Sequence, residues 1–169
     1  MELDPRLHFV VATCIVSRKD LSTDAHGKKG AAKFLIAKRA PHEKAFPNKW
    51  TVPGGKLVLT EYQNLPRTSD THPQWYNVVE WVLRKEVREE VGLEVEKPNY
   101  LTDLVFVRPD GYPVVTLSYW AWYKNGEVKL DNSNTDFAWV TLDEAKGYDL
   151  IEGIWDELEA VEKIILERK

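Results

Sequence analysis

A short acidic segment in the second half of the chain constrains the fold most strongly, because it must be the end of a helix. Lys85–Leu93 reads Lys-Glu-Val-Arg-Glu-Glu-Val-Gly-Leu, and Gly92 stands where a glycine commonly ends a helix. On that helix, Glu86 lies three residues before Glu89 and four before Glu90, so the three carboxylates share one face. Each such pair of like charges costs roughly 0.2–0.5 kcal/mol. The segment therefore predicts a helix end that a divalent cation would stabilise.

A glycine turn precedes this helix by some thirty residues. Trp50–Lys56 reads Trp-Thr-Val-Pro-Gly-Gly-Lys, which predicts a short strand that ends in a turn. The helix itself is predicted over Pro73–Val91, because Thr71 or His72 can cap its start and proline is favoured in a first helical turn. A strand, a turn and an acidic helix therefore follow one another.

The remaining pattern predicts one domain over residues 1–169 of the α/β (α+β) class. Arg108–Pro113 contains Pro-Asp-Gly and predicts a hairpin turn. A second helix is predicted over Leu150–Arg168, with Ile151, Ile154, Trp155, Leu158, Val161 and Ile165 on one apolar stripe. Strands are predicted at Leu7–Val16, Phe34–Ala37, Trp50–Val52, Leu101–Val107, Val114–Tyr123 and Phe137–Val140.

Composition excludes several classes of protein. The net charge of −4 gives no basic surface for nucleic acid, so no specific nucleic-acid partner is expected. Cys14 is the single cysteine and lies in an apolar run, which favours a core residue over a nucleophile. No apolar run reaches the roughly 18 residues of a membrane span, and no basic leader precedes one. We expect a cytoplasmic protein without membrane attachment, as a monomer or homodimer.

The two segments together resemble the Nudix box of MutT-like hydrolases. In that family a glycine is followed after five residues by Glu, and after seven more by Arg-Glu-apolar-any-Glu-Glu-any-Gly-apolar. Glu86–Leu93 matches every specified position, with Lys85 in place of the arginine. Gly55 and Glu61 reproduce the opening spacing, but 23 residues follow Glu61 before Lys85. Since the family pattern has seven there, the resemblance implies an insertion of 16 residues (23 minus 7) within the box.

The insertion leaves the position of the first box glutamate open. Counting back eight residues from Lys85 reaches Asn77, whereas Glu61 stands before the insertion. We favour Asn77, because a continuous helix from Pro73 would fix its place relative to Lys85.

The inserted loop, about residues 59–72, has two interpretations. A surface loop of this length costs little entropy and can be tolerated without a function. Alternatively, the loop and the residues that follow it form a flap that faces the substrate, with Arg67, His72, Trp75 and Tyr76 as candidate contacts.

The resemblance implies an α/β/α sandwich with a mixed β-sheet and a Mg²⁺ site in which Mn²⁺ can substitute. Glu86, Glu89, Glu90 and the carbonyl of Gly54 would supply hard oxygen ligands. Glu86, Glu89 and Lys85 are the candidate catalytic residues, with Lys85 orienting the carboxylates. Lysine cannot make the two-pronged contact of arginine, so this substitution departs from the family at a functional position.

The implied activity is hydrolysis of a diphosphate linkage in a nucleotide-type small molecule, such as a nucleotide sugar, ADP-ribose or a modified nucleoside triphosphate. Candidate substrate contacts are Arg39, Lys56 and Trp50. Asp131 and Asp136 are either further acids of the site or parts of a polar turn. The alternative function is a catalytically weak Nudix-like nucleotide-binding or sensor module, which Lys85 and the interrupted box would favour.

Overall fold

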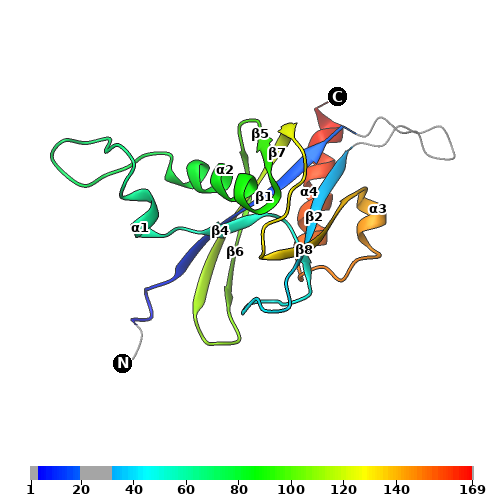
Figure 1. Cartoon of the computed structure of the whole chain (residues 1–169), viewed down its shortest axis with the longest axis horizontal. Helices are drawn as coiled ribbons and strands as arrows, with labels where there is room; N and C mark the ends of the chain where they lie inside the picture. Colours follow the sequence, from blue (N-terminus) through cyan, green and yellow to red (C-terminus); the bar gives the residue numbers. More distant parts are fainter. Residues whose placement is uncertain (1–3, 20–31, 169) are drawn as a thin grey trace.

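The computed structural model describes residues 4–19 and 32–168, and they form a mixed β-sheet between helices (Figure 1). Strands β1 (Phe9–Arg18) and β7 (Pro113–Gly126) pair in parallel at the centre of the sheet. The other strand pairs are antiparallel, in the path β3-β2-β1-β7-β5, with β4 beside β1, β6 beside β7 and β8 beside β2. The remaining strands are β2 (Lys33–Arg39), β3 (Trp50–Thr51), β4 (Gly54–Lys56), β5 (Leu93–Val95), β6 (Asn99–Val107) and β8 (Asn134–Val140).

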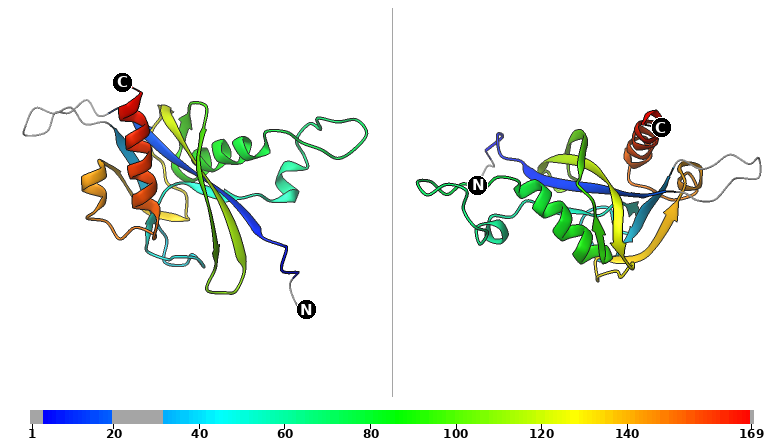
Figure 2. Two further views of the ribbon diagram at one scale, coloured as in Figure 1. Left: turned by 180° about the vertical axis from the view of Figure 1, so that it is seen from behind. Right: turned by 90° about the horizontal axis from the view of Figure 1, so that it is seen from above.

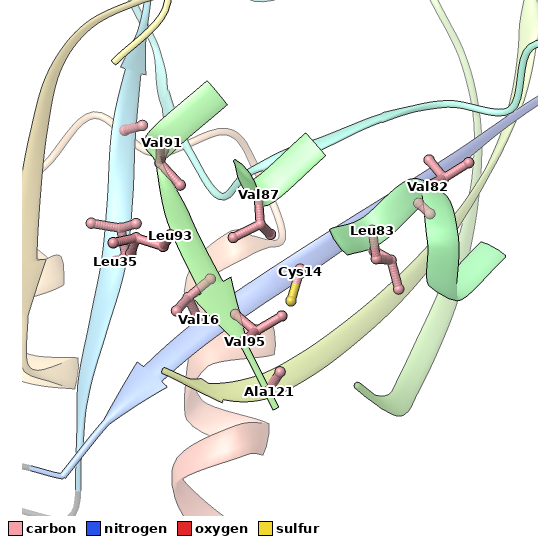
Figure 3. Close-up of a cluster of buried hydrophobic side chains, with 12 residues drawn as sticks. Cys14, Val16, Leu35, Val82, Leu83, Val87, Val91, Leu93, Val95 and Ala121 are labelled. Atoms are coloured by element: carbon pink, nitrogen blue, oxygen red, sulfur yellow. The ribbon is translucent and has the colours of Figure 1, made fainter. Parts of the chain in front are cut away.

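Helix α2 (Val78–Val91) covers one face of this sheet and carries the acidic segment. Its buried residues are Val82, Leu83, Val87 and Val91, and they pack on a face of β1 that includes Cys14 (Figure 3). Cys14 is fully buried, as the sequence predicts, and this burial raises the pKa of its thiol to about 12. The thiol is therefore a protonated part of the core.

Helix α4 (Ile154–Glu167) covers the opposite face (Figure 2). The helix starts at Ile154 and not at the predicted Leu150, so Ile151 lies before it. Of the predicted stripe, Ile154, Leu158, Val161 and Ile165 are buried, and they pack against β1, β2 and β7 through residues such as Ile15, Phe34 and Trp120, whereas Trp155 is half-buried. The short helix α3 (Leu142–Ala145) is capped by Thr141, which forms a capping box with Glu144. Helices on both faces of a mixed sheet confirm the predicted fold class.

The start of the acidic helix differs from the sequence prediction. Helix α2 begins at Val78 and not at Pro73, because Asn77 adopts a left-handed conformation with φ of 61°. A left-handed residue interrupts helical propagation. Residues 73–76 therefore belong to the connection, and Asn77 is the N-cap of α2, eight residues before Lys85. The sequence also missed α1 (Leu59–Tyr62), α3 and the three-residue strands β4 and β5.

The connection between α1 and α2 projects from the body in all three views (Figures 1 and 2). It closes on itself, since the backbone N–H of Thr68 donates to the carbonyl of Gln74 at 2.9 Å. Trp75 donates from Nε1 to the Leu65 carbonyl at 3.0 Å and meets the ring of Tyr62 edge-on.

Within the described residues, no helix is long and apolar enough to cross a membrane.

This self-contained connection predicts tolerance of a shorter loop. Replacing the five residues Ser69–Pro73 by Asn-Gly between the bonded pair Thr68 and Gln74 should change the melting temperature by less than about 3 °C, because a two-residue turn closes such a pair. Trp75→Ala should lower it further, since an aromatic pair contributes about 0.5–1.5 kcal/mol. Calorimetric melts of both variants check this, and a large loss of stability in the shortened chain would contradict it.

Candidate functional site

A cleft of about 500 Å³ lies beside the C-terminal half of α2 and collects most of the predicted site residues. Its walls come from α2, β1, β4, β6, β7 and α4, and from the segment after β2. The predicted residues that line it are Arg39, Gly54, Lys56, Glu61, Glu86, Glu89, Glu90 and Asp131. Residues separated by more than 90 positions in the sequence therefore meet in one depression.

Lys85 joins three carboxylates at this cleft. Its Nζ lies 3.0 Å from Glu86 Oε1, 3.1 Å from Glu89 Oε2 and 3.3 Å from Glu61 Oε2. Burial would lower the pKa of Lys85, but the hydrogen bonds to Glu86 and Glu89 outweigh it and hold this pKa well above its ordinary value. Lys85 is therefore a permanent cation at the centre of an acidic group.

The position of Glu61 reverses our preference for Asn77. Glu61 lies on α1 and reaches Lys85 across the base of the insertion. Asn77 stands eight residues, about two helical turns, before Lys85 and does not line the cleft. Because the insertion leaves and re-enters the body at α1 and α2, loop closure brings Glu61 to the box carboxylates.

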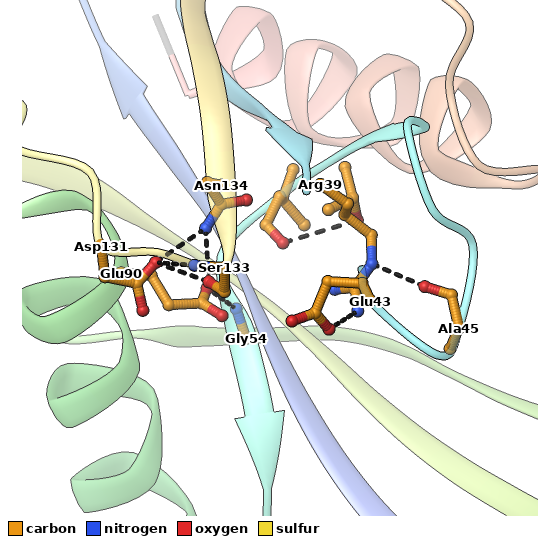
Figure 4. A network of polar contacts seen from close by, with 10 residues as sticks. Arg39, Glu43, Ala45, Gly54, Glu90, Asp131, Ser133 and Asn134 are labelled. Carbon is orange, nitrogen blue, oxygen red and sulfur yellow. Dashed lines mark hydrogen bonds and ion pairs between the residues drawn. The ribbon is translucent and has the colours of Figure 1, made fainter. Parts of the chain in front are cut away.

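The glycine turn contacts α2 directly. The backbone N–H of Gly54 donates to Glu90 Oε2 at 3.0 Å (Figure 4). A Cβ atom on Gly55 would lie 2.2 Å from the carboxyl carbon of Glu86, a distance that real Cβ atoms do not reach. The absence of a side chain at Gly55 therefore allows the turn to approach the acidic helix.

Glu90 is the most enclosed of the box carboxylates. Burial raises its pKa to about 8, with Glu86 and Asp131 adding to the rise, whereas the Gly54 N–H and Arg39 oppose it. In Figure 4, Glu90 and Asp131 lie side by side next to Gly54. A buried acid beside other acids is costly to ionise without a cation.

Arg39 is held by the segment that follows β2. Its Nε donates to the Ala45 carbonyl at 2.7 Å, and its Nη2 pairs with Glu43 Oε2 at 2.5 Å (Figure 4). A phosphate that binds Arg39 can use its remaining N–H groups or exchange with Glu43. Lys56, at the exposed rim of the cleft, has its Nζ 5.9 Å from the ring centre of Phe9.

The remaining predicted residues divide between cleft and periphery. Asp131 lines the cleft and accepts hydrogen bonds from the backbone and hydroxyl of Ser133. Asp136 is exposed on β8, outside the cleft lining, and accepts from the Phe137 N–H. Trp50 also lies outside the lining, with its ring 4.8 Å from that of Tyr148. The flap candidates Arg67, His72, Trp75 and Tyr76 do not line the cleft either.

Sequence reasoning did not select Phe106, Ser118 and Glu157, which also line the cleft. The available signal was in β7, where Thr116 and Ser118 are polar residues at alternate positions of an apolar strand. Alternation of this kind marks a strand face that is not entirely core.

The donor set fits a hard divalent cation. Carboxylates of Glu86, Glu89 and Glu90 lie beside the Gly54 turn, and oxygen ligands suit Mg²⁺ or Mn²⁺. In residues 4–19 and 32–168, no three acidic, histidine or cysteine side chains converge at metal-ligand spacing. The reason lies in the contacts described above, because Glu86 and Glu89 turn to Lys85 while Glu90 turns to the Gly54 N–H. Cation binding requires rotation of these side chains.

Comparisons with known proteins agree with this geometry. No family model matches the chain. The nucleoside triphosphatase NudI of Klebsiella pneumoniae (strain 342) is 28% identical over 127 residues, which cover 69% of this chain and 79% of NudI. A MutT protein from Methanosarcina mazei Go1 superposes with a TM-score of 0.64 at 19% identity, covering 99% of both chains. The Nudix domain of Shewanella oneidensis NrtR, solved with ADP ribose, superposes with a TM-score of 0.69 at 15% identity, covering 96% of this chain and 94% of that domain.

The superpositions show that the chain has the Nudix fold. With the box residues gathered on α2 and the similarity to NudI, the resemblance to Nudix hydrolases seen in the sequence is confirmed.

The contact between Glu61 and Lys85 generates a test of the box assignment. Glu61→Gln should lower kcat at least tenfold, about 1.4 kcal/mol, because it removes one anchor of Lys85. Asn77→Gly, which suits the left-handed backbone at that position, should leave kcat within about twofold. Steady-state kinetics on both variants measures this, and the opposite order would restore Asn77.

The burial of Glu90 predicts how the stability of metal-free protein varies with pH. A raised carboxyl pKa means that the folded state keeps a proton that the unfolded state releases between about pH 4.5 and 8. The free energy of unfolding should therefore fall as pH rises through this window, by up to about 1.4 kcal/mol per pH unit from this group. Urea unfolding with a chelator should show this decline weakened in Glu90→Gln and retained in the exposed control Glu127→Gln. An equal slope in both variants would contradict the assignment.

Proposed function

We propose that this protein is a divalent-metal-dependent hydrolase that cleaves a phosphoanhydride linkage in a nucleoside diphosphate derivative. The observation that carries the proposal is the convergence of the acidic face of α2 with the Gly54 turn at one wall of the cleft. Arg39 and Lys56 line the same cleft and can hold phosphate oxygens. Phosphoryl transfer requires carboxylates that hold a metal cation beside positively charged side chains that hold the phosphates.

In this mechanism Glu86, Glu89, Glu90 and the Gly54 carbonyl would hold Mg²⁺ or Mn²⁺. When bound, the cation neutralises phosphate oxygens and polarises the attacking water. Glu89 is the candidate for accepting the proton of that water, because its side chain is 58% exposed whereas that of Glu86 is 15% exposed. Lys85 orients the carboxylates of Glu86 and Glu89.

Arg39 is the candidate for binding the phosphate groups of the substrate. Its pairing with Glu43 keeps the guanidinium ordered at the cleft before substrate arrives. Exchange of one carboxylate for a phosphate conserves the charge-assisted hydrogen bonds, so it costs less than ordering a free arginine.

The substrate class is a nucleotide with linked phosphates, such as a nucleoside triphosphate, a nucleotide sugar or ADP-ribose. The nucleoside triphosphatase activity in the name of NudI and the ADP ribose bound by the NrtR domain both support this class. A cleft of about 500 Å³ falls in the range of small-molecule sites.

The alternative is a catalytically weak module that binds a nucleotide as a sensor. Lys85 in place of arginine and the interrupted box were its support. Lys85 nevertheless reaches three carboxylates, and Glu61 is present at the box despite the insertion. These contacts favour the hydrolase.

Substitution of the metal-binding candidates tests the proposal. With Mg²⁺, wild-type protein should release phosphate or pyrophosphate, or a nucleoside monophosphate, from at least one member of a panel of triphosphates, nucleotide sugars and ADP-ribose. Glu89→Gln and Glu90→Gln should each lower kcat at least a hundredfold, about 2.7 kcal/mol, with the fold retained. The matched control is Glu80→Gln, on the same helix but outside the cleft lining and paired with Arg84. Full activity in both site variants would refute the proposal.

A further inference from the structure

A second polar group lies on the α4 side of the cleft and has no part in the chemistry above. Ser118 of β7 and Glu157 of α4 both line the cleft, together with the apolar Val52 and Ile154. Neither residue belongs to the box or to the phosphate-binding candidates. Polar groups held at fixed positions in a pocket commonly orient a ligand.

A chain of hydrogen bonds fixes the Glu157 carboxylate. Thr13 Oγ1 donates to Ser118 Oγ at 3.2 Å, and Ser118 Oγ donates to Glu157 Oε1 at 2.9 Å. Ser118 is 1% exposed, so solvent does not compete for its hydroxyl. Both hydroxyl protons thus point along one path that ends at the carboxylate.

The second oxygen of this carboxylate has no partner. Glu157 Oε2 is buried and accepts no hydrogen bond from residues 4–19 or 32–168. Arg108, a cation that also lines the cleft, pairs with Asp110. A buried acceptor without a donor destabilises the fold, and such an atom in a native structure requires an explanation. A ligand that brings N–H donors into the cleft would supply the missing partner.

Burial is also the main reason that the pKa of Glu157 is raised, with Ser118 opposing the rise and Asp156 adding to it. Donors from a ligand would favour the ionised carboxylate. The terminal torsion of glutamate is broad, so the carboxylate can turn to a ligand within the cleft.

Two aromatic side chains supply the surface that a flat ring requires. Phe46 and Phe106 both line the cleft, with ring centres 6.2 Å apart and planes tilted by 51°. Nucleic-acid bases stack favourably on aromatic rings of this kind. Phe46 follows Ala45, whose carbonyl accepts from Arg39, so the stacking surface adjoins the phosphate-binding candidate.

We propose that Glu157, positioned by Ser118, is a specificity-determining residue that selects nucleotides whose base presents adjacent N–H donors, as guanine does. Ionised carboxylates only accept hydrogen bonds. The N1–H and N2–H₂ groups of guanine satisfy both oxygens, whereas the carbonyl groups of uracil oppose them. This inference rests on the proposed function, because it assumes that a nucleotide occupies the cleft. Sites that hydrogen-bond one substrate discriminate strongly against an analogue that leaves their polar groups unpaired.

The test compares wild-type protein with Glu157→Gln, in which the amide offers one donor and one acceptor at nearly the same volume. Calorimetric binding of GMP and UMP measures base selection without turnover, and kcat/KM for GTP and UTP with Mg²⁺ measures it during reaction. Wild-type protein should prefer guanosine at least tenfold in both assays, and Glu157→Gln should reduce this ratio at least fivefold. Ser118→Ala should reduce it by a smaller factor. The control is Glu159→Gln, which lies on α4 outside the cleft lining and pairs with Lys163.

The outcomes separate this inference from the proposed function. Absence of hydrolysis with retained, Glu157-dependent binding of GMP would refute the hydrolase but support base selection. Hydrolysis of GTP and UTP at a ratio that Glu157→Gln leaves unchanged would overturn the inference alone. Equal affinity of wild-type protein for GMP and UMP, or affinity for neither, would overturn it as well. Melting curves verify that each variant is folded.

Discussion

The ammonium group of Lys85 is the interaction on which the site depends. One cation within about hydrogen-bonding distance of Glu61, Glu86 and Glu89 offsets a repulsion that would otherwise oppose the end of α2. It also joins α1 to α2, so the same contact that balances charge fixes where the insertion begins. Replacement of arginine by lysine at this position exchanges a planar fork for a compact charge that three carboxylates can surround.

The sheet gives that ionic group its rigidity. Parallel pairing of β1 with β7 places Thr13 beside Ser118, while β4 adds Gly54 to the edge of β1. Helices α2 and α4 bury separate apolar clusters on the two faces. The cleft therefore receives acidic side chains from one helix and Glu157 from the other, with strands between them. We infer that phosphate chemistry and base selection are supported by different layers of one sandwich.

Prediction from sequence succeeded where periodicity or turn chemistry is strong. The α4 stripe, the buried Cys14 and the hairpin after β6 follow from local pattern. It failed at Glu61, because the position of this residue depends on a contact that loop closure makes with Lys85. It also failed at the start of α2, because the left-handed conformation of Asn77 moves the first helical residue to Val78. Short elements such as β4 owe their existence to pairing with β1 and carry little signal of their own. Glu157 was missed because nothing local distinguishes it from other acids of α4.

The projecting connection between α1 and α2 changes the residue spacing of the box without changing the contacts among its side chains. Glu61, just before this connection, contacts Lys85 in the helix that follows it, so the path between α1 and α2 can lengthen without displacing these two side chains. The connection is therefore a suitable position for inserting a fluorescent peptide or a second binding module. An insert there would lie outside the cleft and leave its lining residues in place.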